Sequence, residues 1–472
     1  MTWDVVIGCE VHCQLATKSK LFCSCSTSFG APPNTQVCPV CAGYPGVLPT
    51  LNGAAVELAI RAGRALGCEI QDSSTFDRKN YFYPDLPKGY QITQYNRPIC
   101  LGGSLEFEVD GQGKSVRLTR IHIEEDAGKL SHGPGGTVVD LNRAGTPLIE
   151  IVSEPDLRSA DEVVAYLKSL RNLVRWIGVS DGHMEQGSFR CDANVSIRKG
   201  TDEPFGTRVE LKNLNSFMHV KKAIEYEVAR QASELDSGRK IIQQTRLWDD
   251  RAGVTRAMRS KEEAMDYRYF PEPDLPPLQL PDGWDSVPLP ELPAERVARY
   301  RDQLGLSAYD AQVLTAEPEL SAYFEDVLST GANPKTSANW VQVELLGRLN
   351  ADGLSTTESP VTPDELGQIL ARLADKKLSG KLAKLALARA YEGEKLAAIF
   401  EDLGEQVVDP NAIREPVKQL IEDNPAQVQK YLDGNQQLIG WFIGQIMKTS
   451  KGRANPQVVK SVLTEMLEAT RE

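Results

Sequence analysis

Apolar and polar residues alternate along much of the first part of the chain. In residues 5–15 the odd positions are apolar or carry a thiol, whereas the even positions include Glu10, His12 and Gln14. Alternate residues of a β-strand share a face. This segment therefore predicts a strand with one face in a hydrophobic core, while the other face presents a carboxylate beside an imidazole.

The same alternation recurs in later segments, namely residues 121–126, 149–151, 188–198 and 208–212. Their polar positions carry acids with basic or amide residues nearby: Glu124, Glu125, Glu150, Arg190, Asp192, Asn194, Glu210 and Lys212. Each strand taken singly is typical of an ordinary amphipathic strand with a solvated face. Several together depart from the Thr and Lys residues that strand surfaces usually favour.

Pairing of these strands in one sheet would bring the acids together. Each close like-charge pair then costs about 1 kcal/mol in water and about 4 kcal/mol at an effective dielectric near 20. Bound Mg²⁺ would relieve this repulsion, since it prefers carboxylate oxygens and is often shared with substrate phosphates. His12 is a less usual Mg²⁺ neighbour, and could be a ligand or orient one.

The pattern changes after a proline-rich stretch at residues 270–293, which indicates a boundary. Beyond it, Thr362, Pro363 and Glu365 form a helix-start signature. Two final helices are expected over residues 436–448 and 456–468. We expect an α+β protein built on an antiparallel sheet, with domains at 1–292 (catalytic), 293–404 (helical) and 405–472 (helical tail).

Composition narrows the class of protein. With 41% hydrophobic and 25% charged residues, the 472-residue chain is typical of a soluble globular protein. Its net charge of −12 argues against a generally basic nucleic-acid coat, although not against a local basic patch. No export signal or membrane-spanning run is expected. The nine cysteines therefore indicate reduced thiols and a cytoplasmic protein.

Four cysteines lie in two close pairs around a loop rich in Gly, Pro and Asn. They are Cys23, Cys25, Cys38 and Cys41. This spacing predicts a tetrahedral thiolate site for Zn²⁺, closed and therefore structural. The alternative is a set of buried or free thiols, and a disulfide is less favoured in the cytosol.

A phosphate-binding loop of the Walker type is not expected. The nearest match is Gly113, Lys114 and Ser115, but Glu108 stands where the first glycine is required. If the protein binds ATP, metal ions and Arg or Lys side chains on a sheet face would hold the phosphates.

Ordered motifs along the whole chain resemble one family, the B subunits of aspartyl/glutamyl-tRNA amidotransferase. The strongest is 139–152, Val-Asp-Leu-Asn-Arg-Ala-Gly-Thr-Pro-Leu-Ile-Glu-Ile-Val. The others are 8–15, 81–91, 122–129, 192–196, 210–216, 266–275, 444–448 and 452–456. Cys9 stands where the family often has an aliphatic residue.

This resemblance implies a cradle-shaped catalytic domain related to the glutamine-synthetase fold, followed by a helical domain and a helical tail. It also implies a heterotrimer in which the other two chains are an amidase subunit and a small third subunit. The amidase would release ammonia from glutamine. The B subunit would use ATP to phosphorylate the side-chain carboxylate of Glu-tRNA(Gln) or Asp-tRNA(Asn), and ammonia would then displace the phosphate.

Site residues are predicted on this basis. The metal and activation site is assigned to Glu10, His12, Glu124, Glu125, Glu150, Asp192 and Glu210. Phosphate or carboxylate contacts are assigned to Lys88, Arg190 and Lys212, with structural ion pairs as the alternative for each. Contacts to mischarged tRNA are assigned to Lys448, Lys451 and Arg453, for which a solvated basic loop is the alternative. Trp441 and Phe442 are expected in the tail core.

Two rival hypotheses remain at this point. The chain could be a non-catalytic, zinc-stabilised scaffold that binds tRNA, although the acid-lined strand faces count against this. It could also be the archaeal relative that pairs with an asparaginase-like partner, but that relative carries an inserted domain. Neither an amidase signature nor a Cys/His nucleophilic pair is evident, so ammonia is expected from a partner protein.

Overall fold

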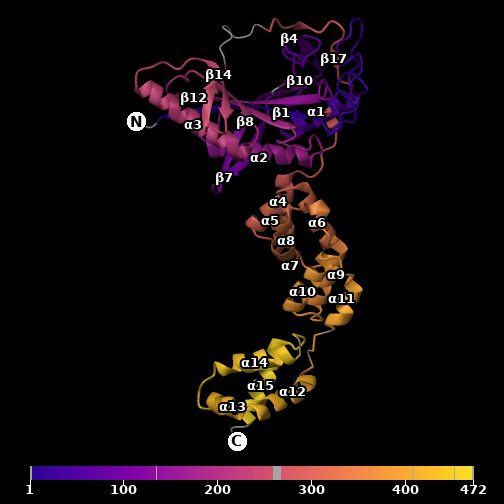
Figure 1. Ribbon diagram of the computed structural model, residues 1–472, viewed down its shortest axis with the longest axis vertical. Coiled ribbons are helices and arrows are strands. Elements are labelled where there is room, and N and C mark those ends of the chain that lie inside the picture. The colour runs from indigo at the N-terminus through magenta and orange to yellow at the C-terminus, as the bar shows by residue number, and fades with distance from the viewer. Residues whose placement is uncertain are drawn as a thin grey trace. The chain divides into compact units, whose positions relative to one another are not determined.

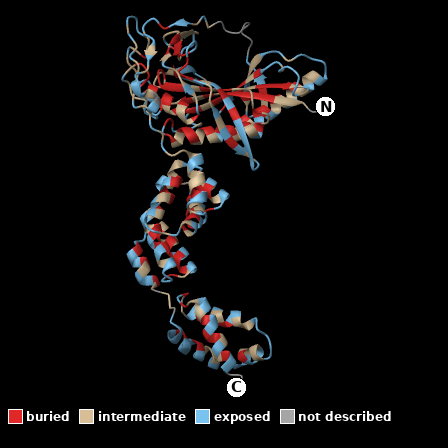
Figure 2. Ribbon diagram, turned by 180° about the vertical axis from the view of Figure 1, so that it is seen from behind, coloured by how far each residue is buried: buried red, intermediate tan, exposed pale blue. Residues whose placement is uncertain are grey.

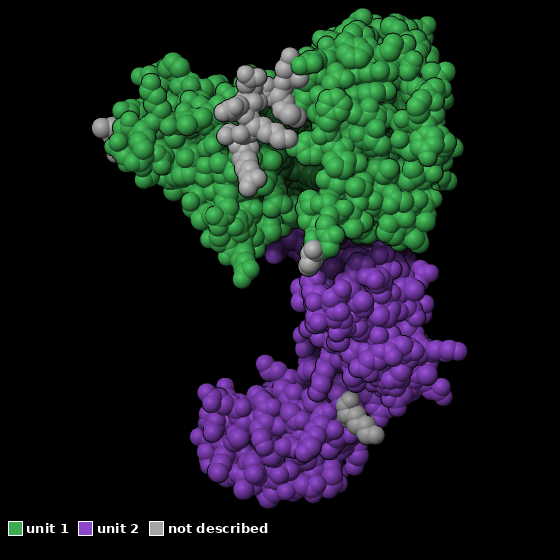
Figure 3. Space-filling view, turned by 45° about the horizontal axis from the view of Figure 1, so that its top comes forward, with its two compact units in different colours: residues 1–293 green, residues 294–472 purple. Residues whose placement is uncertain are grey.

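The computed structural model describes residues 3–133, 135–258, 267–404, 406–407, 409–450 and 452–469. It divides into two compact units, Met1–Pro293 and Ala294–Glu472, which are coloured separately in Figure 3. The first unit combines a large sheet with helices, and the second is helical throughout its described part (Figure 1).

The first unit is built on a large, mainly antiparallel sheet. Within the described residues, thirteen strands belong to it, with the main order β15-β14-β13-β12-β1-β11-β8-β5-β4-β16 and with β2, β6 and β7 off this path. The pair β13–β14 is parallel. The first unit also contains two separate two-stranded sheets, β9–β10 and β3–β17. The strands are β1 (Asp4–Gln14), β2 (Glu69–Ile70), β3 (Ser73–Ser74), β4 (Asp77–Asn80), β5 (Tyr90–Thr93), β6 (Cys100–Leu101), β7 (Ser104–Val109), β8 (Gln112–Glu125), β9 (Lys129–Gly133), β10 (Gly136–Asp140), β11 (Pro147–Ser153), β12 (Phe189–Arg198), β13 (Val209–Leu214), β14 (Gln244–Asp249), β15 (Val254–Ala257), β16 (Phe270–Pro271) and β17 (Leu278–Gln279).

The register of the central strands decides which polar residues meet. On β1, His12 lies opposite Glu150 of β11, and Glu10 lies opposite Asp192 of β12. Glu150 in turn lies opposite His122 of β8. Residues directly opposite each other in a sheet project from the same face. The polar positions predicted for separate strands are thus gathered on one face of the sheet.

Three helices cover the opposite, apolar face: α1 (Gly53–Ala65), α2 (Ala160–Trp176) and α3 (Phe217–Asp236). Each begins at a polar cap, Asn52, Ser159 or Ser216, whose side chain accepts a hydrogen bond from the first turn. Figure 1 shows α2 and α3 lying along one side of the sheet, and in Figure 2 the buried residues follow the strands and the inner faces of the helices.

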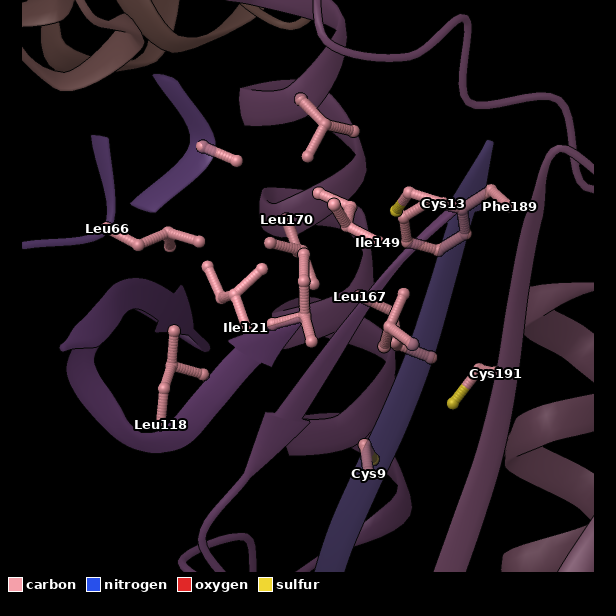
Figure 4. Close-up of a cluster of buried hydrophobic side chains, with 14 of the residues drawn as sticks. Cys9, Cys13, Leu66, Leu118, Ile121, Ile149, Leu167, Leu170, Phe189 and Cys191 are labelled. Carbon is pink, nitrogen blue, oxygen red and sulfur yellow. The ribbon is translucent and has the colours of Figure 1, made fainter. Parts of the chain in front are cut away.

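The odd-numbered residues of β1 enter this core as predicted. Figure 4 shows Cys13 beside Ile149 and Phe189, with Cys9 farther along the same strand, and both cysteines are buried. Full burial of a Leu or Ile side chain contributes about 1.5–3 kcal/mol. The hydrophobic core therefore holds the strands in register and leaves the even-numbered residues of β1 on the other face.

The proline-rich stretch is part of the first unit and not a free linker. Its residues form β16, β17 and the 3₁₀ turn η1 (Trp284–Ser286). Glu272 is buried and accepts two hydrogen bonds from Arg78, at 2.8 and 2.9 Å. Proline does not prevent these short strands because they lie at an edge or in a two-stranded pair, where fewer backbone donors are needed.

The second unit contains two separate hydrophobic clusters, within residues 300–403 and 413–467. The predicted domain division at residues 292 and 404 stays a prediction. None of the helices in the described residues has the length and apolar character needed to cross a membrane. The elements are α4 (Pro293–Asp302), α5 (Ala308–Leu314), α6 (Pro318–Ser329), α7 (Pro334–Asn339), the π-helix η2 (Trp340–Leu345), α8 (Leu346–Asp352), η3 (Thr356–Glu358), α9 (Pro363–Ala374), α10 (Gly380–Tyr391), α11 (Leu396–Leu403), α12 (Pro410–Asp423), α13 (Pro425–Leu432), α14 (Leu438–Thr449) and α15 (Pro456–Ala469).

Candidate active site and metal centres

A first cluster on the polar face joins His12, Glu124 and Glu150, from strands β1, β8 and β11. One potential ligand atom from each lies within 4.8 Å of the others. The Nε2 atom of His12 is 3.5 Å from a Glu124 oxygen and 3.6 Å from a Glu150 oxygen. Two carboxylates and an imidazole at these distances can act as ligands of a divalent cation.

His122 lies against this cluster and was not predicted as a site residue. It is buried, and its Nε2 is 3.2 Å from a Glu150 oxygen and 3.7 Å from a Glu124 oxygen. Burial would lower the pKa of His122, but Glu150 and Glu124 raise it to about 9. The signal was present in the sequence, because His122 precedes Glu124 by two positions in a strand.

Lys79 of β4 is a second residue that sequence reasoning missed. Its Nζ lies 4.8 Å from the centre of the Tyr267 ring, a cation–π distance. Burial acts to lower the pKa of Lys79, but Glu124, followed by Tyr269 and Tyr267, raises it. No strand pattern signalled Lys79, because its place near Glu124 depends on the pairing of β4 with β5 and of β5 with β8.

A second cluster joins Glu10, Asp192 and Glu210, whose ligand atoms also lie within 4.8 Å of one another. Lys212 bridges two of these acids, with Nζ 2.6 Å from Asp192 and 2.9 Å from Glu210. Asn194 donates a hydrogen bond of 3.0 Å to Glu10. The strands β1, β12 and β13 each contribute to this cluster, as the register predicts.

The two clusters influence each other electrostatically. Burial is the largest cause that raises the pKa of Glu10, and the charges of Glu150 and Glu210 follow. Burial also acts to raise the pKa of Glu150, but His122 and His12 hold it well below its usual range. A raised carboxylate pKa means that Glu10 carries its charge at a cost, which a bound cation would remove. Carboxylate oxygens, which both clusters supply, are the ligands that Mg²⁺ prefers.

Glu125 is not brought into either cluster. It follows Glu124 in β8, so the two side chains leave opposite faces of the strand. Glu125 pairs with Lys88 and accepts a hydrogen bond of 3.0 Å from the Ile92 backbone. The prediction grouped all seven acidic and histidine residues in one site, whereas the structure gathers six of them in two clusters and separates Glu125.

The predicted phosphate-binding residues all have acidic partners. Lys88 pairs with Glu125, and Arg190 donates a hydrogen bond of 3.0 Å to Asp126. Lys212 is the one of the three that lies inside a predicted metal cluster. Of the two interpretations offered for each residue, the ion pair is present, and phosphate contact stays a prediction.

The four predicted cysteines converge. The Cys41 sulfur lies 4.0 Å from that of Cys25 and 3.9 Å from that of Cys38, and one ligand atom of each of the four lies within 4.8 Å of the others. Four sulfurs held about 2.3 Å from one zinc ion would lie about 3.8 Å apart in a tetrahedron. The Cys23 thiol, with Lys20 adding to it, holds the pKa of Cys41 well below its usual range.

The motif at residues 139–152, called here the signature segment, begins with a loop that supports the loop carrying the four cysteines. Asp140 accepts a hydrogen bond from the Asn34 backbone at 3.0 Å, and Asn142 accepts one from the Gln36 backbone at 2.9 Å. β10 ends at Asp140, and the next residues turn towards the cysteine loop.

In the tail, Lys448 and Arg453 are both exposed, near the loop between α14 and α15, while Lys451 lies outside the described residues. Phe442 is buried as expected. The expectation was wrong for Trp441, which is 37% exposed. The two are adjacent in α14, so their side chains leave the helix in different directions, and only one can face the core.

Comparison with known proteins places these features in a family. A family model described as the GatB/GatE catalytic domain matches residues 5–286, and one described as the GatB domain matches residues 322–467. The aspartyl/glutamyl-tRNA(Asn/Gln) amidotransferase subunits B of Geobacter sulfurreducens and Alkalilimnicola ehrlichii are each 53% identical to the chain, and that of Thermodesulfovibrio yellowstonii is 49% identical. Each match covers 99% of this chain and 100% of the relative. The chain belongs to the GatB/GatE family, among the B subunits of aspartyl/glutamyl-tRNA(Asn/Gln) amidotransferase.

Proposed function

We propose that this protein is the ATP-dependent subunit of a glutamine-dependent amidotransferase. It would convert misacylated Glu-tRNA(Gln), Asp-tRNA(Asn) or both into Gln-tRNA(Gln) and Asn-tRNA(Asn). The family supports the type of reaction, since the relatives are named for this activity. The observation that carries the assignment of the site is the pair of acidic clusters on one sheet face, His12–Glu124–Glu150 and Glu10–Asp192–Glu210.

The chemistry requires such a face. A carboxylate reacts poorly with ammonia because its leaving group would be oxide, whereas an acyl phosphate has a good leaving group. Forming it brings together two anions, the substrate carboxylate and ATP. Mg²⁺ bound there would neutralise this charge and orient the phosphates. Lys212 and Lys79 add fixed positive charge at the two clusters.

In this proposal each cluster holds one metal ion. Glu10, Asp192 and Glu210 would hold one Mg²⁺, and His12, Glu124 and Glu150 would hold another. Glu125, the last residue of β8 and the neighbour of Glu124, would act indirectly by holding Lys88 through their ion pair. Arg190 would hold Asp126, which also accepts a hydrogen bond of 2.9 Å from Gln14 of β1.

The same proposal covers the domain division, the bound zinc, the tRNA contacts and the partner subunits. The first unit would be a cradle related to the glutamine-synthetase fold, and the second would contain a helical domain and a tail divided near residue 404. The cysteine site would bind structural Zn²⁺. Lys448, Lys451 and Arg453 would contact tRNA phosphates. An amidase subunit, which supplies the ammonia, and a small third subunit would complete a cytoplasmic heterotrimer.

A mutation at the second cluster tests this proposal. We expect Glu10→Ala to lower amide formation from ATP and ammonia by at least about 100-fold, because one Mg²⁺ ligand and its charge are lost. The matched control is Glu106→Ala, which removes an exposed glutamate of β7. Single-turnover assays on the reconstituted complex would measure both variants. Unchanged turnover in the folded Glu10 variant would refute the assigned site.

The alternative is a non-catalytic scaffold that is stabilised by zinc and binds tRNA. It predicts tRNA binding but no ATP chemistry on this protein. Adding free ammonia bypasses the partner amidase, so the two functions separate cleanly in one assay. Release of phosphate that depends on misacylated tRNA and on Glu10 favours the enzyme, and its absence favours the scaffold.

A further inference from the structure

Lys20 lies beside the cysteine site in an unusual environment for a lysine. Its side chain is fully buried, with 0% exposure. The ammonium group donates hydrogen bonds to the backbone oxygens of Gln36 at 2.8 Å and Leu141 at 3.2 Å, and to the Cys41 sulfur at 3.4 Å. Among the described residues, no carboxylate oxygen lies within 4.0 Å of it.

A buried ammonium of this kind requires a negative partner. Moving an unpaired charge from water into a protein interior costs several kcal/mol even after relaxation, and two neutral carbonyls do not remove that cost. Of its three acceptors, Cys41 alone can carry a negative charge. Four thiolates around one Zn²⁺ leave a net charge of −2 on the site, so a positive group beside them is favourable.

We propose that Lys20 is a positioning residue of the cysteine site, whose ammonium offsets the excess negative charge of the four thiolates and fixes the metal loop against the signature segment. This inference rests on the proposed zinc site and adds a residue to it. Partners that hydrogen-bond to metal ligands orient those ligands and tune the affinity for the metal.

The surroundings of Lys20 connect the loop that carries the cysteines to the signature segment and to the Lys88–Glu125 pair. The Leu21 backbone donates a hydrogen bond of 2.8 Å to the carbonyl oxygen of Gly145, just before β11. A cavity of about 30 Å³, the size of about one water, is lined by Lys20, Cys41, Lys88 and Glu125. The loop that carries the cysteines and the Lys88–Glu125 pair thus line the same cavity.

A purely structural lysine is the competing explanation, and a spectrum separates the two. Co²⁺ bound by thiolates shows sulfur-to-metal charge-transfer bands. If the Lys20 charge acts on the Cys41 sulfur, its removal makes that sulfur a better electron donor. The bands should then move to lower energy. A lysine that only fills space would leave the band positions unchanged in any variant that folds.

The experiment uses the full chain with Lys20→Met, Lys20→Gln and Lys20→Arg, and with Lys18→Met as the matched control on an exposed lysine of the same loop. Zinc affinity is measured by competition with a chromogenic chelator, and Co²⁺ spectra are recorded in parallel. We expect Met and Gln to weaken zinc binding by about 10–100-fold and to shift the bands. Arg, which keeps the charge, should restore most of both, and Lys18→Met should match the wild type.

Two outcomes would overturn the proposals, and they are distinguishable. If the wild-type chain binds neither Zn²⁺ nor Co²⁺ through thiolates, the zinc site itself fails. If the wild type binds zinc but the folded Met or Gln variant keeps the same affinity and band positions, the role of Lys20 fails alone. Lys20→Gln can still donate hydrogen bonds to the two carbonyls, so it provides the test should Lys20→Met not fold.

Discussion

Individual side chains on the polar sheet face depend on one another for their charge. His122 is buried between two acids that raise its pKa, and the same histidine keeps Glu150 ionised although burial opposes this. Removing one member therefore leaves a buried charge without its partner, which is costly. The clusters respond to pH as groups and not as independent residues.

His122 predicts how the stability of the metal-free protein depends on pH. Its folded pKa of about 9 exceeds the ordinary 6.5, so its contribution is complete below about pH 6.5 and is lost as pH rises through 9. A shift of this size corresponds to about 3 kcal/mol. In His122→Gln we expect lower stability at pH 6 and a flatter profile between pH 6.5 and 9.

Thermal unfolding in EDTA at several pH values measures this effect. The matched control is His132→Gln, which changes an exposed histidine of β9 and should leave the profile unaltered. A His122 variant that keeps the full wild-type slope between pH 6.5 and 9 would show that this imidazole does not carry the linkage.

At the scale of elements, strand register and loop packing position the site. Glu10 and His12 are two residues apart on β1, and they enter different clusters because each meets different partners on the neighbouring strands. The segment that follows Cys41 packs closely against Lys88 at Gly43, where an added Cβ would lie 2.7 Å from Lys88 Cγ and 3.1 Å from Lys88 Cα. This contact explains the need for glycine there.

Gly43→Ala should therefore destabilise the first unit and disturb Lys88. Gly46→Ala provides a matched control, because both glycines have positive φ but a Cβ at Gly46 meets nothing within 4 Å. We expect the left-handed backbone alone to cost about 1–2 kcal/mol at either position. The contact with Lys88 should add about 1–3 kcal/mol at Gly43. Equal thermal midpoints for the two variants would contradict this packing argument.

At the scale of the whole molecule, charge is distributed unevenly. The chain has a net charge of −12, yet the tail carries exposed basic residues near the loop between α14 and α15. Binding to an RNA backbone depends on such local positive charge and weakens with salt, whatever the net charge of the protein. The proposed tRNA contact therefore has a measurable electrostatic signature.

The double variant Lys448→Ala/Arg453→Ala should bind tRNA more weakly and with a smaller salt dependence. If each residue contacts one phosphate, the slope of log K against log salt should become less negative by about 1.4–1.8. Filter binding at several salt concentrations measures it. Lys430→Ala, on the exposed face of α13, is the control and should keep the wild-type slope. An unchanged slope in the double variant would leave these residues as a solvated basic loop.

Local patterns predicted several strands and helices closely, because the ends of such elements depend on residues that are neighbours in the sequence. The alternation in residues 5–15 predicted β1, observed at Asp4–Gln14. Thr362 and Glu365 form the expected capping box of α9. The final helices, expected at 436–448 and 456–468, are Leu438–Thr449 and Pro456–Ala469. Cysteine spacing likewise indicated a cluster that the loop brings together.

The sequence by itself thus determined the central strands, their polar faces, the cap of α9 and the cysteine pairs, since short-range geometry governs all of these. Tertiary structure alone decided that the acids form two clusters, that Glu125 stands apart, that His122 lies against one cluster and that Lys20 lies beside Cys41. The physical reason is that strand register and burial depend on packing between residues far apart in the chain. A shift of one residue would exchange the faces of a strand without changing its local pattern.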